Sequence, residues 1–299
     1  MCVLIIAEKQ YPSDVTLLLA DRQNGDGVGI AWIENNKVHY EKGLTVDTLL
    51  RDGPWLAAGP PYLIHFRFAT AGSGSGFEGK QLTHPFPVDP SLLVETPRLK
   101  GSANAVLAHN GHLKDWDTQL IDRLDYIDRK LGRFPIGPWS DTRLLATLAG
   151  LAGDDILEVL SDMAGKIAVF RPDSIKRFGV WAWDKDEQLW LSNRGFLNHP
   201  ITKTVRGKNG KTETVTEYYD ARDYWTAADL LAPALITGAR PTIKGWDRDW
   251  EDYRPYDSGR TTAGDLDWIP DHPVDSLGAI VDAWTEQDLA DWIEGGEHE

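Results

Sequence analysis

The chain begins Met1-Cys2-Val3-Leu4-Ile5-Ile6-Ala7, and the fold that the sequence predicts depends on this stretch. Residues 3–7 are an unbroken apolar run with several β-branched side chains, which is typical of a buried β-strand. Cys2 therefore stands at the start of a predicted core strand, directly behind Met1. It is the only cysteine among 299 residues. The sequence thus places a single thiol at one end of the core.

The position of Cys2 allows a particular chemistry. Removal of Met1 leaves a free α-amine on the carbon that carries the thiol. A thiol with a pKa of about 8.5 and an α-amine with a pKa of about 7.7 to 8 both titrate near neutral pH, so the amine can serve as the base that activates the thiol. The alternative is that Cys2 is a small apolar residue in the first strand. Its position alone leaves both interpretations open.

Composition and charge limit the classes of function. The chain is 41% apolar, which is enough for one large or two modest domains. A net charge of −15 argues against direct binding of nucleic acid. With no basic leader and no apolar run of membrane-spanning length, we expect a cytoplasmic protein that does not contact membranes. A single cysteine excludes an intrachain disulfide and a multi-thiolate metal site.

The local patterns predict a mixture of helices and strands. A helix over 15–23 follows the cap residues Ser13 and Asp14, and Asn35-Asn36 joins two strands in a hairpin. The remaining elements are predicted from periodicity and turn signals: helices over 45–52, 115–130 and 140–163, and strands over 62–69, 103–113, 166–171, 177–184 and 188–193. The glycine-rich segment 71–80 lacks a phosphate-loop pattern and is interpreted as a loop or lid.

Asn110-Gly111 ends one of these strands and has two interpretations. Asn-Gly is a common tight-turn dipeptide, which predicts a hairpin turn. Alternatively, the Asn amide and the Gly N–H point at one developing oxyanion, because glycine allows the backbone to approach a ligand closely.

Five motifs occur together in the order of a known family. They are Cys2, His65-Phe66-Arg67-Phe68-Ala69-Thr70, His84-Pro85-Phe86, Ala108-His109-Asn110-Gly111 and Ser140-Asp141-Thr142. Over residues 2–200 the chain resembles the class II glutamine amidotransferase domain, an N-terminal nucleophile (Ntn) hydrolase, in its stand-alone bacterial and phage forms. The resemblance implies an α+β fold, a four-layer αββα sandwich of two stacked, mainly antiparallel sheets. The residue patterns by themselves indicate only mixed α and β structure.

The resemblance also implies roles for individual residues. Cys2 attacks the side-chain amide of glutamine, and Asn110 and Gly111 hold the oxyanion. Arg67 binds the substrate carboxylate through its two-pronged guanidinium, and Asp141 pairs with the ammonium. The remaining substrate-binding positions are Phe68, Thr70 and His84. No cofactor and no metal are implied.

Simpler interpretations remain for several of these residues. The alternative for Arg67 is a surface ion-pair partner, and the alternative for Asp141 is a helix cap. Three histidines, His65, His109 and His112, are interpreted as packing or hydrogen-bonding residues rather than metal ligands. The sequence departs from the family at Ala71, where a histidine often follows the threonine.

The C-terminal part lacks the resemblance. We expect a glutaminase-like domain over 2–225 and an acidic, Trp-rich extension over 226–299 that packs on the domain or docks a partner. Residues 241–299 hold 16 acidic and four basic side chains. The predicted function is a glutaminase that passes ammonia to a separate synthetase or nucleotide-modifying enzyme, because the chain has no nucleotide-binding motif. The alternatives are a stand-alone γ-glutamyl-amide hydrolase and a catalytically silent binding protein on the same scaffold.

Overall fold

The computed structural model describes residues 2–51, 53–69, 76–89, 92, 95–114, 116–117, 136–206 and 212–231. Sheet A has seven strands in the spatial order β10-β11-β1-β4-β2-β3-β6. Their bounds are β1 Val3–Ala7, β2 Val28–Glu34, β3 Lys37–Leu44, β4 Tyr62–Phe66, β6 Lys100–Ala103, β10 Ala182–Asp184 and β11 Leu189–Leu191. Sheet B has the order β5-β7-β8-β9. Its strands are β5 Phe86–Pro87, β7 Val106–Gly111, β8 Gly165–Phe170 and β9 Ile175–Phe178. Every pairing within both sheets is antiparallel.

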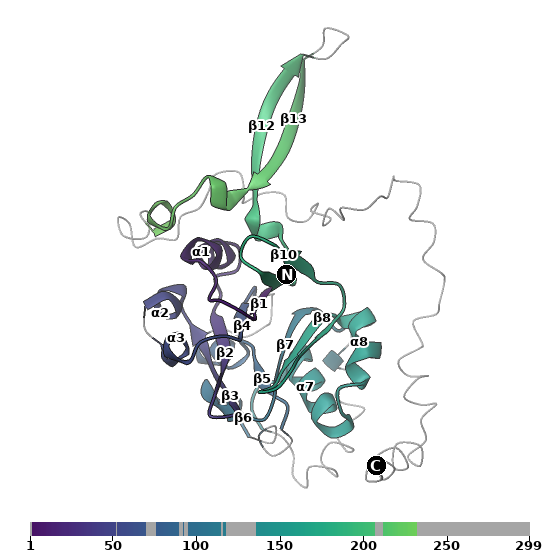
Figure 1. The fold of residues 1–299 in the computed structure, drawn as a ribbon. Coiled ribbons are helices and arrows are strands. Elements are labelled where there is room, and N and C mark those ends of the chain that lie inside the picture. Colours follow the sequence, from purple (N-terminus) through teal and green to yellow (C-terminus); the bar gives the residue numbers. More distant parts are fainter. Residues whose placement is uncertain are drawn as a thin grey trace, which may run out of the picture. The chain divides into compact units, whose positions relative to one another are not determined.

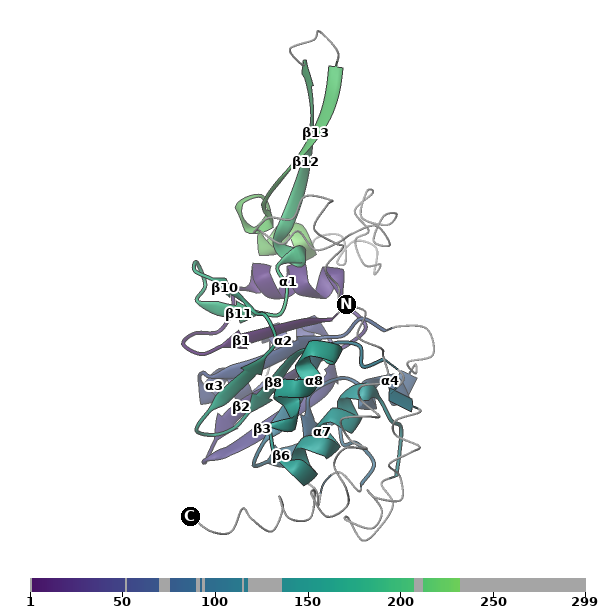
Figure 2. The ribbon, with the colours of Figure 1, turned by 90° about the vertical axis from the view of Figure 1, so that its right-hand side faces the viewer.

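Helices cover the outer faces of the two sheets. They are α1 Asp14–Gln23, α2 Val46–Arg51, α3 Pro54–Ala58, α7 Asp141–Ala152 and α8 Ile156–Ala164. A further helix, α4 Gly76–Gln81, contacts β3. Figure 1 shows α1 to α3 on the side of sheet A, and α7 and α8 on the side of sheet B, and Figure 2 gives the perpendicular view. The order of layers is therefore helices, sheet, sheet, helices. The predicted α+β fold, a four-layer αββα sandwich of mainly antiparallel sheets, is confirmed.

The first strand lies inside sheet A and is buried on both faces. All five residues of β1 are completely inaccessible to solvent. Val3, Ile5 and Ala7 belong to the core cluster shared with α1, α2 and α3, whereas Leu4 and Ile6 belong to the cluster between the sheets. Full burial stabilises the fold by about 1.5–3 kcal/mol for each large apolar side chain. The apolar run that opens the chain is thus the strand on which both cores meet.

Two local predictions are confirmed in detail. Helix α1 begins after Ser13, whose side chain accepts a hydrogen bond from the backbone N–H of Thr16. The β2–β3 hairpin turns at Asn35 and Asn36, which have φ values of 52° and 57°. Asparagine tolerates this left-handed conformation better than most residues, so the turn follows from its side chains.

Other local predictions are wrong, each for a structural reason. Asn110-Gly111 makes no turn, because β7 continues through it and pairs with Lys166 and Gly165 of β8. The strand predicted over 177–184 divides at Gly179, where φ is 80°, and the chain passes from sheet B to sheet A. The helix predicted over 140–163 likewise divides at Gly153, where φ is 82°. The end of the glycine-rich segment forms helix α4 instead of a loop.

A separate two-stranded hairpin follows the sandwich. It consists of β12 Asn198–Arg206 and β13 Thr212–Asp220, flanked by the short 3-10 helices Gly195–Leu197 and Ala221–Asp223. Arg222 ties its base to the fully buried Asp184 of β10, with Nη1 and Nη2 donating to its carboxylate at 2.8 and 3.0 Å.

A short helical stretch over 227–231 comes next, and its Leu230 is buried in the core on the α1 side of sheet A. The predicted boundary at residue 225 stays a prediction, since 232–299 lie outside the described residues. Most of the helix predicted over 115–130 lies outside them too. Among the helices that are described, none has the length and apolarity needed to span a bilayer.

Candidate active site

Cys2 directly precedes β1 and lies beside the segment that follows β4. The register pairs Val3 with Phe66, so in this antiparallel pair the residue before Val3 meets the residues after Phe66. The Phe68 backbone N–H points at Cys2 Sγ over 3.5 Å, and the thiol faces the Phe68 carbonyl oxygen at 4.0 Å. The cysteine itself is half-buried. The strand register thus places the thiol against the predicted substrate-binding segment.

The surroundings of Cys2 act on its thiol in opposite directions. Burial raises the pKa of the thiol above its ordinary value, while the Phe68 backbone, the amino-terminal charge and Arg67 lower it and Asp141 raises it. Arg67, which follows a strand of sheet A, and Asp141, which begins a helix on sheet B, are therefore both close enough to act on the sulfur electrostatically. Both are predicted substrate-binding residues. A thiol with a raised pKa needs a base to become a nucleophile.

The segment carrying Arg67 is fixed by the turn before β2. The Arg67 N–H donates to Gly27 O at 2.9 Å, and Asp26 N donates to Arg67 O at 3.1 Å. The Asp26 carboxylate also accepts from Ala69 N at 2.8 Å. Arg67 is 7% exposed, which does not fit the interpretation as a surface ion-pair residue, whereas Phe68 is 47% exposed. These bonds hold the backbone beside Cys2 in one position.

The Asn110-Gly111 pair lies at the end of β7 in sheet B. Asn110 is 3% exposed, and its Nδ2 donates to Ser192 Oγ at 2.8 Å. A Cβ atom on Gly111 would lie 1.7 Å from the carbonyl oxygen of Ala164 and 2.8 Å from His109 Nε2. Only glycine fits there, because the backbones of β7 and the end of α8 approach so closely.

The sequence patterns did not identify two polar residues beside the thiol, Ser192 and Asn193. Ser192 Oγ accepts from Leu4 N and from Asn110 Nδ2, both at 2.8 Å, so Ser192 joins β1 of sheet A to β7 of sheet B. Asn193 Nδ2 donates to the carbonyl oxygen of Cys2 at 3.0 Å. The only signal in the sequence was that both polar residues directly follow the apolar strand β11.

Asp141 is the first residue of α7, and Ser140 is the cap, its Oγ accepting from Arg143 N at 3.2 Å. The Asp141 carboxylate accepts from Leu113 N at 3.2 Å and from Thr142 N at 2.7 Å. Its Oδ2 also lies 3.8 Å from Nδ1 of His109. The interpretation of Asp141 as the cap is thus wrong, since Ser140 has that role. The carboxylate is held at the helix N-terminus, where negative charge is favourable.

Three buried histidines, His65, His84 and His109, lie close to one another. The rings of His65 and His84 stack with centroids 4.0 Å apart, and those of His84 and His109 are 6.5 Å apart. His84 Nδ1 accepts from the His109 backbone N–H at 3.3 Å. Burial lowers the pKa of His109 and holds those of His65 and His84 well below the ordinary value, and Lys42 nearby lowers the latter two further. The contacts of His84 are interior ones, and its substrate-binding role stays a prediction.

The rest of the predicted site is less defined. Thr70 lies outside the described residues. In the described part of the chain, no group of three or more His, Cys, Asp or Glu side chains could hold a metal ion.

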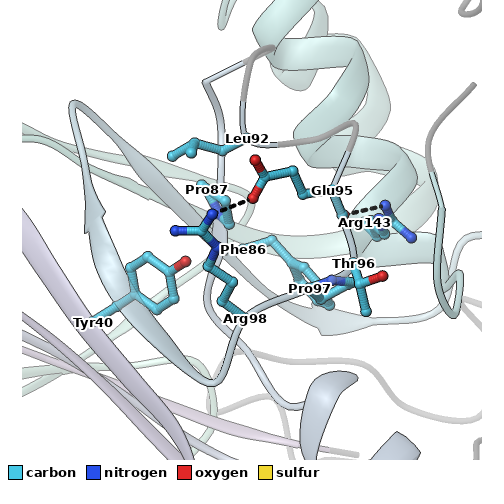
Figure 3. Close-up of a pocket in the computed structure, with 9 residues that line it drawn as sticks. All are labelled: Tyr40, Phe86, Pro87, Leu92, Glu95, Thr96, Pro97, Arg98 and Arg143. Carbon is cyan, nitrogen blue, oxygen red and sulfur yellow. Dashed lines mark hydrogen bonds and ion pairs between the residues drawn. The ribbon is translucent and has the colours of Figure 1, made fainter. Parts of the chain in front are cut away.

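Figure 3 shows a pocket that Cys2 does not line. Its buried Arg143 donates Nη2 to the backbone carbonyl oxygens of Glu95 and Ile136 at 3.0 and 2.8 Å, so this guanidinium holds loops together. Arg98 pairs with the Glu95 carboxylate at 2.5 Å. We assign the pocket no function.

Comparison with known proteins gives several similar solved structures, two of which are described here. One is the glutamine phosphoribosylpyrophosphate amidotransferase of B. subtilis complexed with ADP and GMP, 18% identical, with a TM-score of 0.43. This chain resembles a glutamine amidotransferase. The other is an allosteric regulatory enzyme of purine biosynthesis, 19% identical, also with a TM-score of 0.43. Each match covers 73% of this chain and 49% of the other.

This chain thus spans about half the length of each of those two proteins. No protein-family model and no curated protein matches it. Because the identities and TM-scores are low, the function proposed below is argued from the contacts of Cys2.

Proposed function

We propose that the protein is an amidohydrolase of the glutamine amidotransferase type, with Cys2 as its nucleophile after removal of Met1. The observation that carries the proposal is the set of contacts around the thiol. The Phe68 backbone N–H points at Sγ, and Arg67 and Asp141 act on it electrostatically. Ser192 ties the strand that follows Cys2 to Asn110, and Asn193 donates to the carbonyl oxygen of Cys2. A cysteine with only a packing role needs none of these polar neighbours.

The substrate is matched by the charges beside the thiol. Glutamine carries an α-carboxylate, an α-ammonium and an uncharged amide. The Arg67 guanidinium suits the carboxylate, because its planar fork can donate two hydrogen bonds. The Asp141 carboxylate suits the ammonium. The two charged residues then fix the backbone end of the substrate, which leaves the side-chain amide to reach the sulfur.

The reaction proceeds in two half-reactions. The α-amine of Cys2 takes the thiol proton, Sγ bonds to the amide carbon, and the oxygen becomes an oxyanion near Asn110 and Gly111. The C–N bond then breaks as the amine returns the proton to the leaving nitrogen, which departs as ammonia. Water attacks the resulting γ-glutamyl thioester, its proton passes to the amine and on to the sulfur, and glutamate leaves. Ammonia is then passed to a separate acceptor enzyme in the cytoplasm.

The test is a direct assay of both products. Purified full-length protein lacking Met1 should release glutamate and ammonia from glutamine in equal amounts. Asparagine, one methylene shorter, should react far more slowly, because its amide carbon cannot reach the sulfur while both charged ends are bound. No release of glutamate from glutamine or from a γ-glutamyl amide would reject the proposal in favour of the silent binding protein.

A second substrate class remains within the same chemistry. A γ-glutamyl amide with a substituted nitrogen keeps the carboxylate and ammonium, and differs only in its leaving group. Comparison of kcat/KM for glutamine and for γ-glutamyl-ethylamide distinguishes the two, because ammonia and ethylamine are similar leaving groups. A higher value for the ethylamide would identify a stand-alone γ-glutamyl-amide hydrolase, and a higher value for glutamine an ammonia-producing glutaminase.

A further inference from the structure

The hydroxyl of Ser192 joins the two sheets close to the thiol. It is 2% exposed and accepts from Leu4 N of β1 and Asn110 Nδ2 of β7, both at 2.8 Å. The Ser192 N–H donates in turn to Leu4 O at 3.0 Å. Ser192 is therefore bound to the nucleophile strand by two hydrogen bonds and to the predicted oxyanion residue by a third.

Two hydrogen-bonding groups of Ser192 and Asn110 have no partner in the arrangement described. A serine hydroxyl has one proton to donate as well as lone pairs to accept. In the arrangement above both contacts of Ser192 Oγ are accepted ones, and within the described residues its proton has no acceptor. At the same time Asn110 Oδ1 is buried and has no partner in that part of the chain. A buried donor and a buried acceptor are thus both unpaired on the two residues that share this hydrogen bond, which is costly.

Rotation of the Asn110 amide by half a turn pairs the Ser192 hydroxyl proton with Asn110 Oδ1. The oxygen and nitrogen of an amide occupy nearly the same space, so the rotation changes no packing. The Ser192 hydroxyl then accepts from Leu4 N and donates to Asn110 Oδ1. The only group left without a partner is Asn110 Nδ2, at the place that Oδ1 held. A buried amide donor kept unpaired in this way is ready for an anion.

We propose that Ser192 is a positioning residue: its hydroxyl, itself held by Leu4 N, donates to Asn110 Oδ1 and turns Asn110 Nδ2 toward the oxyanion. This inference rests on the proposed function and adds the residue that orients its oxyanion donor. Because Leu4 is two residues from Cys2, the same hydroxyl also fixes the donor relative to the sulfur. A misdirected amide would present its oxygen, which repels an oxyanion.

The experiment is a double-mutant cycle with Ser192→Ala and Asn110→Ala in the full chain, measured as glutamate release from glutamine. Ser192→Ala should lower kcat about tenfold or more, and at most by the roughly 100- to 1000-fold that loss of an oxyanion donor costs, with KM nearly unchanged. In the Asn110→Ala background the same change should cause little further loss, because the residue it orients is gone. Ser192→Thr, which keeps a hydroxyl, should recover most of the activity. The thermal midpoint is recorded for each variant.

The possible outcomes separate the two proposals. If wild-type protein releases no glutamate, the proposed function fails and the role of Ser192 fails with it. If wild-type protein is active but Ser192→Ala has an unchanged kcat, only the positioning role is overturned. Full additivity of the two losses would overturn it as well, since that result indicates independent effects. If Ser192→Ala does not fold, Ser192→Cys retains the volume with a weak hydrogen-bonding group, and the same cycle decides.

Discussion

Sheet A and sheet B contribute to the candidate active site by different means. Sheet A supplies Cys2 and Arg67, which lie opposite each other because β1 and β4 are neighbours in antiparallel register. Sheet B supplies Asn110 at a strand end, and Asp141 follows on the helix that covers that sheet. The first pair is positioned by backbone pairing, and the second by buried polar contacts. The comparison shows that strand register alone assembles half of the site, while the other half depends on long-range hydrogen bonds.

The largest effect is expected from sheet A, at the nucleophile. Cys2→Ala should reduce glutamate release below detection, because no other thiol exists in the chain. The fold should remain, since the side chain is only half-buried and alanine also permits removal of Met1. Glutamate release and the thermal midpoint measure the two properties. Turnover that persists in this variant would assign the chemistry to another residue.

The next effect tests sheet B. Asn110→Ala should lower kcat on the order of 100- to 1000-fold if its amide stabilises the oxyanion. Asn104→Ala makes the same chemical change at an exposed residue between β6 and β7 and serves as the control. Equal rates for the two variants would remove Asn110 from the site and leave sheet A to act alone.

A smaller effect is expected from a change in Arg67, the residue proposed to bind the α-carboxylate of the substrate. Arg67→Lys keeps the charge but loses the second hydrogen bond of the guanidinium fork, a charge-assisted bond worth about 1.5–3 kcal/mol. KM for glutamine should therefore rise about tenfold or more, with a smaller change in kcat. Arg51→Lys, at a side chain that is 67% exposed, is the matched control. A loss confined to kcat would place Arg67 outside the substrate-binding contacts.

The last effect is on stability rather than on turnover, and it concerns the three buried histidines. Burial lowers the pKa values of His65, His84 and His109 in the folded state. The unfolded chain therefore binds more protons as pH falls below about 6.5, and the free energy of unfolding decreases by up to about 1.4 kcal/mol per pH unit for each histidine. Urea unfolding between pH 8 and 5 should show a plateau above pH 7 and a decline below it. His84→Gln should make the decline shallower, and an equal slope would contradict this.

Local patterns predicted the parts of the molecule that local chemistry determines. The β-branched run 3–7, the Ser13 cap and the Asn35-Asn36 turn each have their physical cause within a few residues. The division of the strand at Gly179 could not be predicted, because a glycine there is compatible with a bulge or with a change of sheet. The stacking order of the sheets came from the family resemblance rather than from periodicity.

The polar half of the site was predicted least well. Asn110 and Asp141 were identified through motifs, but Ser192 and Asn193 were not. The hydrogen bond between Leu4 and Ser192 spans 188 residues, and the one between Asn110 and Ser192 spans 82. Contacts of this kind leave no periodic trace in the sequence. The ring contacts among His65, His84 and His109 likewise leave no pattern in the sequence, because they join three separate segments of the chain.

Intact-protein mass spectrometry after treatment with a glutamine-like electrophile such as a diazoketone examines the N-terminal thiol itself. We expect the untreated protein to lack the mass of Met1 and the treated protein to gain one adduct, located on Cys2 and prevented by excess glutamine. Retention of Met1 in the active preparation, or an adduct that excess glutamine does not prevent, would contradict a catalytic role for Cys2 as the N-terminal residue.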